Sequence, residues 1–247
     1  MPRAVQGARL EVDGLTKSFY GVRALNDVAF GVAPGELVGL IGPNGSGKTT
    51  AIDCITGFLK PDRISARLDG ESIDGERPDR LARRGLVRTF QQVRIFSTLS
   101  VNQNISMGGW ALGHPPRERD WTAVDRRSGE LIDALSLRRL ADAPAGHLSY
   151  GQRKLVEFGA GLQCLPRLLV LDEPVAAVNP TLARAMRDRI VELNRDGVSV
   201  LLIEHNMELV TDICHRLVVL DHGEKIADGP PAEVMALAQV QEAYFGR

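Results

Sequence analysis

Short runs of apolar residues, separated by turn-forming Gly, Pro and Asp, dominate the first third of the chain. Such runs predict β-strands. We expect four of them, at residues 9–12, 28–32, 36–41 and 66–68. Three further runs near the end of the chain alternate with helical segments, which predicts a parallel sheet. These runs are at residues 168–172, 198–204 and 216–221.

The middle of the chain, residues 101–161, has few strand-forming runs and predicts helices. Within it, the polar residues 114–127 predict a helix or a loop insertion. An earlier segment, residues 76–88, contains five arginines, and we interpret it as a solvated helix face. The pattern predicts one α/β domain over residues 1–247. In that domain, a helical subdomain at about 92–161 interrupts a core at about 8–91 and 162–247.

The composition excludes several classes of protein. Lys plus Arg number 30 against 31 Asp plus Glu, so the net charge is -1 and no basic excess indicates nucleic-acid binding. Cys54, Cys164 and Cys214 have no paired spacing, which is typical of buried thiols in a reducing compartment. The first ten residues show no signal-peptide pattern, and no apolar run approaches the roughly 20 residues that cross a bilayer. We therefore expect the chain to act at a membrane only by docking onto another protein.

A glycine-rich loop follows the run at 36–41. Residues 42–49 read Gly-Pro-Asn-Gly-Ser-Gly-Lys-Thr and match the pattern G-x-x-x-x-G-K-[ST]. Backbone N–H groups of such a loop, and the start of a helix at 49–57, form a concave site for phosphates. On this solvent-facing loop we expect Lys48 to contact the β- and γ-phosphates and Thr49 to bind Mg²⁺. The candidate ATP-binding residues here are Gly42, Pro43, Asn44, Gly45, Ser46, Gly47, Lys48, Thr49 and Thr50.

The run at 168–172 ends in two adjacent acids, Asp172 and Glu173. Buried strands rarely end in this way unless a cation or a reaction needs the carboxylates. We expect Asp172 to bind Mg²⁺ and Glu173 to orient and deprotonate an attacking water. The loop and the acids together predict a P-loop NTPase with a RecA-like core. The absence of an Asn-Lys-x-Asp motif argues against a GTPase.

Residues 148–152 narrow the prediction to one family. They read Leu-Ser-Tyr-Gly-Gln and resemble the L-S-G-G-Q signature of ABC ATPases. The resemblance covers residues 10–246 and looks closest to ATP-binding subunits of branched-chain amino acid and related amide or urea importers. It rests also on the segments at 88–91, 203–207 and 240–246. It implies an antiparallel β subdomain near the N-terminus and a signature that closes over ATP bound to a partner subunit. The signature residues are Ser149, Tyr150, Gly151 and Gln152.

Four further positions resemble landmarks of the family. Gln91, or alternatively Gln92, resembles the glutamine that contacts Mg²⁺ or the lytic water. Tyr20, or alternatively Phe19, resembles the aromatic residue that stacks on adenine. His205 resembles the histidine that contacts the γ-phosphate, and Asn179 occupies a D-loop position where many members have Asp. The resemblance implies that the catalytic residues are Glu173, His205 and Gln91, and that the metal ligands are Thr49, Gln91 and Asp172.

The resemblance implies an ATP-hydrolysing subunit of an ABC transporter that uses ATP and Mg²⁺. Its expected cargo is branched-chain amino acids or related small polar solutes. Its expected partners are membrane permease subunits and a second ATP-binding subunit, identical or different, and it would lie at the cytoplasmic face of the inner membrane. The alternatives are a soluble ABC ATPase, such as one in iron–sulfur assembly, and a nucleotide-binding regulator without turnover. We also expect Val93, Ile95, Phe96 and Leu99 to contribute to a partly exposed apolar groove for a permease helix.

Overall fold

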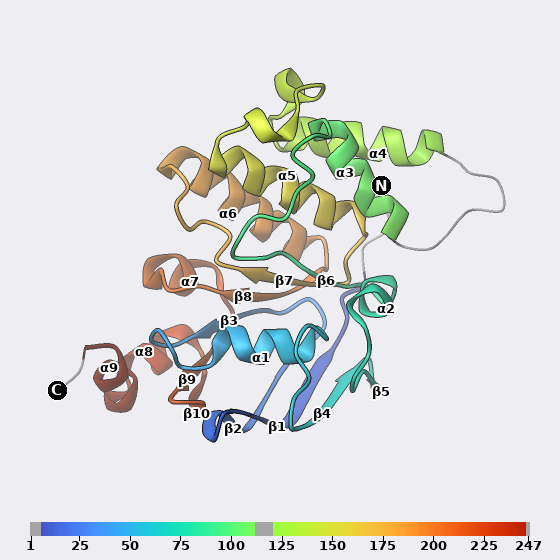
Figure 1. Ribbon diagram of the computed structural model, residues 1–247. Helices are drawn as coiled ribbons and strands as arrows, with labels where there is room; N and C mark the ends of the chain where they lie inside the picture. The colour runs from blue at the N-terminus through green and yellow to red at the C-terminus, as the bar shows by residue number, and fades with distance from the viewer. Residues whose placement is uncertain (1–5, 112–120, 246–247) are drawn as a thin grey trace.

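Two β-sheets form the centre of the computed structural model, which describes residues 6–111 and 121–245 (Figure 1). The first sheet is antiparallel, with the strand order β2-β1-β4-β5. Its strands are β1 (Leu10–Phe19), β2 (Val22–Val32), β4 (Arg63–Leu68) and β5 (Glu71–Ser72). The second sheet has the order β10-β9-β3-β8-β7-β6 and is parallel except for the pair β10–β9. Its strands are β3 (Leu37–Ile41), β6 (Leu86–Arg88), β7 (Leu168–Asp172), β8 (Ser199–Ile203), β9 (Arg216–Asp221) and β10 (Glu224–Gly229).

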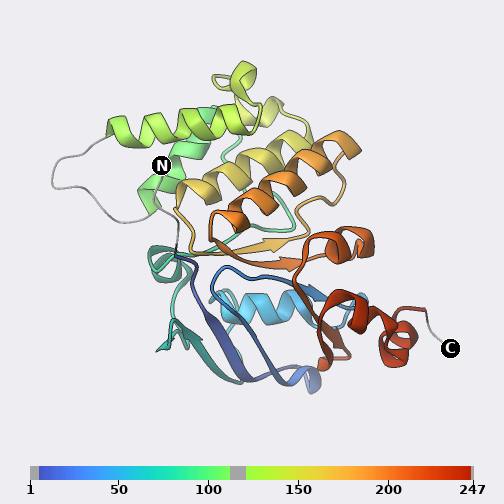
Figure 2. The same cartoon turned by 180° about the vertical axis from the view of Figure 1, so that it is seen from behind.

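Helices cover the second sheet and extend beyond it as a separate helical layer (Figures 1 and 2). The α-helices of the described residues are α1 (Lys48–Ile55), α2 (Pro78–Arg83), α3 (Val101–Ala111), α4 (Trp121–Ala134), α5 (Tyr150–Gln163), α6 (Pro180–Arg195), α7 (Met207–Ile213), α8 (Pro231–Ala236) and α9 (Ala238–Phe245). Two short 3₁₀ turns, η1 (Arg138–Leu140) and η2 (Ala145–His147), precede α5.

Alternate residues of the parallel strands face two different hydrophobic cores. Leu169 and Leu171 of β7 join the core that includes Phe158 of α5 and Ile190 of α6. Val170, between them, joins the core formed with α1 and the antiparallel sheet. Because both faces are covered, β3, β7 and β8 contain only buried residues and appear in the sequence as continuous apolar runs. The layers are therefore helices, parallel sheet, α1 and antiparallel sheet (Figure 2).

The predicted fold class is confirmed, while several element bounds differ. The strands expected at 9–12 and 28–32 are longer, because β1 and β2 continue through polar residues to a tight hairpin. The helical layer consists mainly of α3, α4 and α5, and α5 continues two residues past the boundary expected at 161. Of the stretch 114–127, residues 114–120 lie outside the described residues, and residues 121–127 belong to α4. No helix in the described ranges has both the length and the apolar character to span a membrane.

The interpretation of residues 76–88 as one solvated helix face was wrong. Only Pro78–Arg83 is helical, and the chain then enters β6, which pairs with β7. The side chain of Arg88, at the end of β6, is 5% exposed. The sequence pattern missed this short strand because charged residues surround its apolar pair, Leu86 and Val87.

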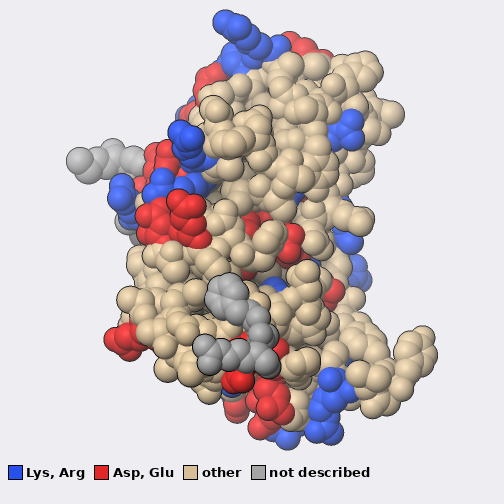
Figure 3. All heavy atoms as spheres, turned by 90° about the vertical axis from the view of Figure 1, so that its left-hand side faces the viewer, with Lys and Arg blue, Asp and Glu red and all other residues tan. Residues whose placement is uncertain are grey.

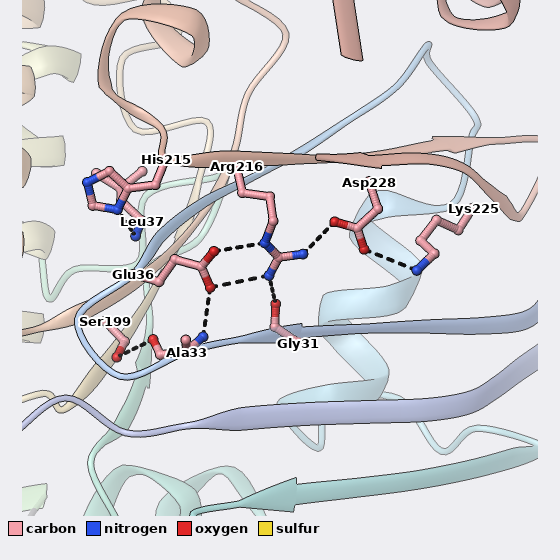
Figure 4. A network of polar contacts seen from close by, with 9 residues as sticks. All are labelled: Gly31, Ala33, Glu36, Leu37, Ser199, His215, Arg216, Lys225 and Asp228. Atoms are coloured by element: carbon pink, nitrogen blue, oxygen red, sulfur yellow. Dashed lines mark hydrogen bonds and ion pairs between the residues drawn. The ribbon is translucent and has the colours of Figure 1, made fainter. Parts of the chain in front are cut away.

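A polar network around Arg216 of β9 ties the two sheets together (Figure 4). Its guanidinium donates to both carboxylate oxygens of Glu36, at 2.8 and 3.2 Å, and to the carbonyl of Gly31 in β2. It also pairs with Asp228 of β10, which in turn binds Lys225 at 3.1 Å. Burial raises the pKa of Glu36, but hydrogen bonds and the charge of Arg216 outweigh burial, and the net pKa is lowered. The network therefore holds the antiparallel sheet against the edge of the parallel sheet.

Candidate nucleotide site

The loop between β3 and α1 is shaped to receive anions. Gly47 precedes the first helical residue with φ of 103°, a left-handed conformation that glycine adopts without a steric penalty. A Cβ atom at this position would lie 2.7 Å from a side-chain carbon of Leu25 and 2.8 Å from the carbonyl oxygen of Ala24. No side chain caps α1, so its first N–H groups are available to a ligand. The start of the helix also favours negative charge.

The loop was expected to face solvent; its residues Asn44 and Gly45 are exposed, but Lys48 lies across the loop and is buried. Its residue is only 9% exposed. Its Nζ donates to the carbonyl oxygens of Gly42 and Pro43, both at 2.8 Å, and to Ser46 Oγ at 3.3 Å. Burial lowers the pKa of Lys48, while the charges of Glu173 and Asp172 oppose that shift. The ammonium group therefore lies within the electrostatic influence of Asp172, the last residue of β7, and of Glu173 directly after it.

Asp172 ends β7 as a buried carboxylate, 2% exposed. Its Oδ2 accepts from Arg88 Nη2 at 2.9 Å, and Arg88 Nη1 pairs with Asp53 of α1 and donates to Thr56 Oγ1 at 3.2 Å. Burial raises the pKa of Asp172, and Arg88 opposes this shift. The guanidinium of Arg88 also lies 5.1 and 5.7 Å from the rings of Phe90 and Phe58. Sequence reasoning missed this arginine as a partner of the site.

Glu173, Gln91 and His205 form a cluster directly after Asp172. Gln91 Nε2 donates to Glu173 Oε2 at 3.1 Å, and His205 Nδ1 lies 3.5 Å from Glu173 Oε1. The three residues follow β6, β7 and β8, which are neighbours in the sheet, so their carboxyl ends meet at one edge. The structure therefore brings together the three residues expected to be catalytic. Gln91 makes the contact with Glu173. This supports Gln91 over Gln92 as the glutamine of the site.

The signature residues lie at the start of α5. Ser149 caps the helix: its Oγ accepts from the N–H of Gln152 at 3.3 Å, and Gln152 Oε1 accepts from the N–H of Ser149 at 2.9 Å. The Ser149 hydroxyl proton is not used by this cap. Tyr150 Oη donates to the carbonyl of Gln91 at 3.1 Å. A Cβ atom at Gly151 would lie 2.8 Å from Leu182, so the helix start packs closely on α6.

The two other landmark positions are those of Asn179 and Tyr20. Asn179 caps α6, and its Oδ1 accepts from the N–H of Leu182 at 2.9 Å. Tyr20 is fully exposed in the turn between β1 and β2. Phe19 is 40% exposed, and the ammonium of Lys17 lies 5.3 Å from its ring centroid. Tyr20 thus offers an unobstructed ring on which an adenine could stack. This supports Tyr20 over Phe19 as the stacking residue.

The residues present fit a nucleotide with Mg²⁺. Mg²⁺ prefers oxygen ligands and binds through one or two protein groups plus phosphate and water. Thr49 is an exposed hydroxyl at the start of α1, and Asp172 and Gln91 supply a carboxylate and an amide oxygen. A glycine loop at a helix start, a buried lysine and two acids at the end of β7, which β8 separates from β3, define the class of P-loop nucleotide hydrolases.

Comparison with known proteins narrows this class. The profile of the family described as "ABC transporter" matches residues 25–176. The chain is 37% identical to the high-affinity branched-chain amino acid transport ATP-binding protein BraF of Pseudomonas aeruginosa, over 96% of this chain and 97% of that protein. It is 35% identical to the corresponding LivG protein of Escherichia coli K12, with the same coverage. The chain belongs to the ABC transporter family, and its enzyme class is ATPase.

Solved structures agree with this assignment. A nucleotide-free ATP-binding cassette from an ABC transporter superposes with a TM-score of 0.86 at 33% identity, covering 97% of this chain and 100% of that one. A cassette in its ADP conformation superposes with a TM-score of 0.83 at 32% identity, covering 97% and 99%. The fold is therefore that of an ATP-binding cassette over nearly the whole chain.

Proposed function

We propose that this chain is the ATP-hydrolysing subunit of an importer for branched-chain amino acids or related small polar solutes. The observation that carries the hydrolytic part is the cluster of Gln91, Glu173 and His205 beside Lys48 and Asp172. The cargo class follows from the relatives, whose names describe branched-chain amino acid transport at 35–37% identity over nearly their full length.

In this proposal each residue of the site has a distinct role. Lys48 leaves its carbonyl partners to bind the β- and γ-phosphates, and the N–H groups of its loop bind the remaining phosphate oxygens. Thr49, Gln91 and Asp172 would hold Mg²⁺, which would supply positive charge to the phosphates when bound. Glu173 accepts the proton of the attacking water. His205, beside Glu173, contacts the γ-phosphate.

The signature would act on ATP bound to a second ATP-binding subunit. Ser149 and Gly151 lie at the start of α5, where an unused hydroxyl proton and free N–H groups can donate to phosphate oxygens. The parallel strands end toward the left-hand side of Figure 1, which Figure 3 shows face on, and residues other than Lys, Arg, Asp and Glu cover most of that face. Charged residues are depleted from the centres of protein interfaces. This face therefore suits a partner subunit, with ATP buried between the two.

A groove of about 410 Å³ beside Gln91 would receive the membrane permease. Its apolar lining comes from several elements and includes Phe58, Leu81, Phe90, Ile95, Phe96 and Met107. Phe58 and Phe96 are 46% and 56% exposed, which is unusual for large aromatic side chains. Of the four residues expected here, Ile95 and Phe96 line the groove, and Val93 and Leu99 are half-buried outside its lining.

Replacing the proposed base tests the hydrolytic site and the partner arrangement together. Glu173→Gln keeps the side-chain shape but cannot accept a proton, so turnover should fall by about 10²–10⁴-fold while ATP still binds. Trapped ATP should link two subunits, because a ligand held across an interface favours association. We expect ATP-dependent dimers of Glu173→Gln on size-exclusion chromatography that dissociate in ADP.

Glu233→Gln, at an exposed glutamate of α8, is the control and should hydrolyse ATP normally. Undiminished hydrolysis by Glu173→Gln would exclude Glu173 as the base. A slow variant that remains monomeric in ATP would instead require a different ATP-binding chain as the second subunit.

A further inference from the structure

The proposed base, Glu173, is held in an unusual backbone conformation. Its φ is 47°, in the left-handed region that disfavours residues with a Cβ atom. Such a conformation persists only when surrounding contacts enforce it. The N–H of Glu173 donates to the carbonyl of Ile203 at 2.9 Å. Its own carbonyl accepts a hydrogen bond from Lys154 Nζ. The backbone of the base is thus fixed from both sides.

Lys154 is a buried cation with a restricted choice of partners. The residue is 3% exposed and belongs to α5, five positions after Ser149. A buried ammonium is unfavourable unless it is hydrogen-bonded and close to negative charge. The charges that act on Lys154 are those of Glu204, Glu157, Glu173 and Asp172. The hydrogen bond that this ammonium makes, however, is to the carbonyl of Glu173 rather than to a carboxylate.

A second connection runs from the same helix to the same base. Tyr150, the first residue of α5, donates from Oη to the carbonyl of Gln91 at 3.1 Å. The side chain of Gln91 in turn donates to Glu173 Oε2 at 3.1 Å. The ring of Tyr150 lies 5.7 Å from Lys154 Nζ, so the two connections are adjacent. The first turns of α5 therefore contact both the backbone and, through Gln91, the side chain of Glu173.

We propose that Lys154 is a positioning residue that couples the signature helix to the base of its own subunit. The inference rests on the proposed function, in which the signature binds ATP of the partner while Glu173 acts on ATP of its own loop. A displacement of α5 on engaging the partner's nucleotide reaches Glu173 through Lys154. Binding at one ATP site thereby sets the geometry of the base at the other, by contiguous contacts within one chain.

Lys154→Met tests this role, because methionine preserves most of the side-chain volume and removes the donor. We expect kcat to fall about 10–100-fold, within the range that a positioned base contributes. The KM for ATP should change less than about threefold, since no phosphate contact is lost. ATP-dependent dimers should still form, as for Glu173→Gln. Lys154→Arg retains a cation that can donate to the carbonyl and should recover at least part of kcat.

The matched control is Arg153→Met, one position earlier on α5. Arg153 donates to the carbonyls of Leu148 and Gly146, at 3.0 and 2.7 Å, and is not a partner of Glu173 in these contacts. Its loss should alter the KM or dimerisation through the signature rather than kcat alone. If Lys154 had only a general structural role, Lys154→Met and Arg153→Met would instead change kcat, KM and dimerisation in the same way.

Combining variants separates this proposal from the one on which it rests. If Lys154 acts through Glu173, the double variant Lys154→Met/Glu173→Gln should be no slower than Glu173→Gln alone. The positioning role would be overturned if the fold-losses in kcat of the two single variants multiply in the double variant. A normal kcat in Lys154→Met would also overturn it. Full activity of Glu173→Gln would contradict the proposed base itself.

A second variant keeps the coupling testable if Lys154→Met does not fold. Tyr150→Phe removes only a hydroxyl and should lower kcat about 3–10-fold. An unchanged kcat in Tyr150→Phe would then overturn the coupling.

Discussion

Arg88 shows how much of a site can depend on one buried side chain outside the recognisable motifs. It compensates the charges of Asp172 and Asp53, and its guanidinium lies beside the rings of Phe58 and Phe90, which line the groove of about 410 Å³. Arg88→Met would leave the 2%-exposed Asp172 with an uncompensated charge. We expect the free energy of unfolding to fall by about 3–5 kcal/mol, measured by denaturant titration.

The control for Arg88 is Arg77→Met, at an arginine of the same segment whose side chain is 79% exposed. Its substitution should change the free energy of unfolding by less than about 0.5 kcal/mol. Adding Asp172→Asn to Arg88→Met should recover part of the loss, because the buried charge is then removed. Equal and small losses in the free energy of unfolding for Arg88→Met and Arg77→Met would show that the buried pair of Arg88 and Asp172 contributes nothing to stability.

The motif residues were predictable because each motif is contiguous and carries its own chemical reason. Gly42 to Thr49 carry the pattern of an anion-binding loop in consecutive residues, and Asp172 and Glu173 come directly after the apolar residues of one run. The pairing of Arg88 with Asp172 spans 84 positions and depends on the register of β6 against β7. No local pattern in the sequence encodes that register.

At the level of elements, the long apolar runs were predicted correctly, whereas strands β5, β6 and β10 were not predicted. Strands β3, β7 and β8 are covered on both faces, which leaves a strong apolar signal. Strand β5 has two exposed residues, and β10 is mainly polar at the edge of its sheet. Their strand conformation comes from pairing with β4 and β9, which is a tertiary effect.

The groove between α2, α3 and α5 gives a prediction about assembly. Phe96→Asp places a charge in the apolar lining, and a buried aromatic contact at an interface is worth about 2 kcal/mol or more. We expect at least about 30-fold weaker binding to the permease subunits, measured by co-purification and titration of the purified components. The melting temperature should not change, because Phe96 is 56% exposed.

Leu237→Asp is the control, at a residue that is 40% exposed after α8 and absent from the groove lining. It should leave the binding of permease unchanged. Unaltered binding by Phe96→Asp would exclude the groove as the docking surface, and equal losses in both variants would indicate a nonspecific effect of added charge.

Across the whole molecule, the network around Arg216 contributes to the attachment of the antiparallel sheet, together with the hydrophobic core that both sheets share (Figure 4). Glu36→Gln should lower the free energy of unfolding by about 1–3 kcal/mol at neutral pH, because two charge-assisted hydrogen bonds are weakened. The pKa of Glu36 is lower in the folded state than its ordinary value of 4.5. Its contribution is therefore fully present above the unfolded pKa and is lost as the pH falls through the folded pKa.

Denaturant titrations of both proteins at several pH values check this expectation. The difference in free energy between wild type and Glu36→Gln should be constant above about pH 5 and should narrow below it. Glu192→Gln, at an exposed pair with Arg189, should show little difference at any pH. If the difference in free energy of unfolding between wild type and Glu36→Gln widens as the pH falls, the lowered pKa of Glu36 would be contradicted.

The left-handed backbone at Glu173, the proposed base, has a cost in thermodynamic stability. A side chain in this conformation costs about 1–2 kcal/mol relative to glycine, which adopts it freely. The free energy of unfolding of Glu173→Gly should therefore be about 1 kcal/mol higher than that of Glu173→Ala. Denaturant titration of the two variants measures this difference. Equal stabilities would show that the backbone at this position is relaxed. Selection for robustness alone would favour glycine here, so under the proposed role of Glu173 as the base, turnover is maintained at this position at the expense of stability.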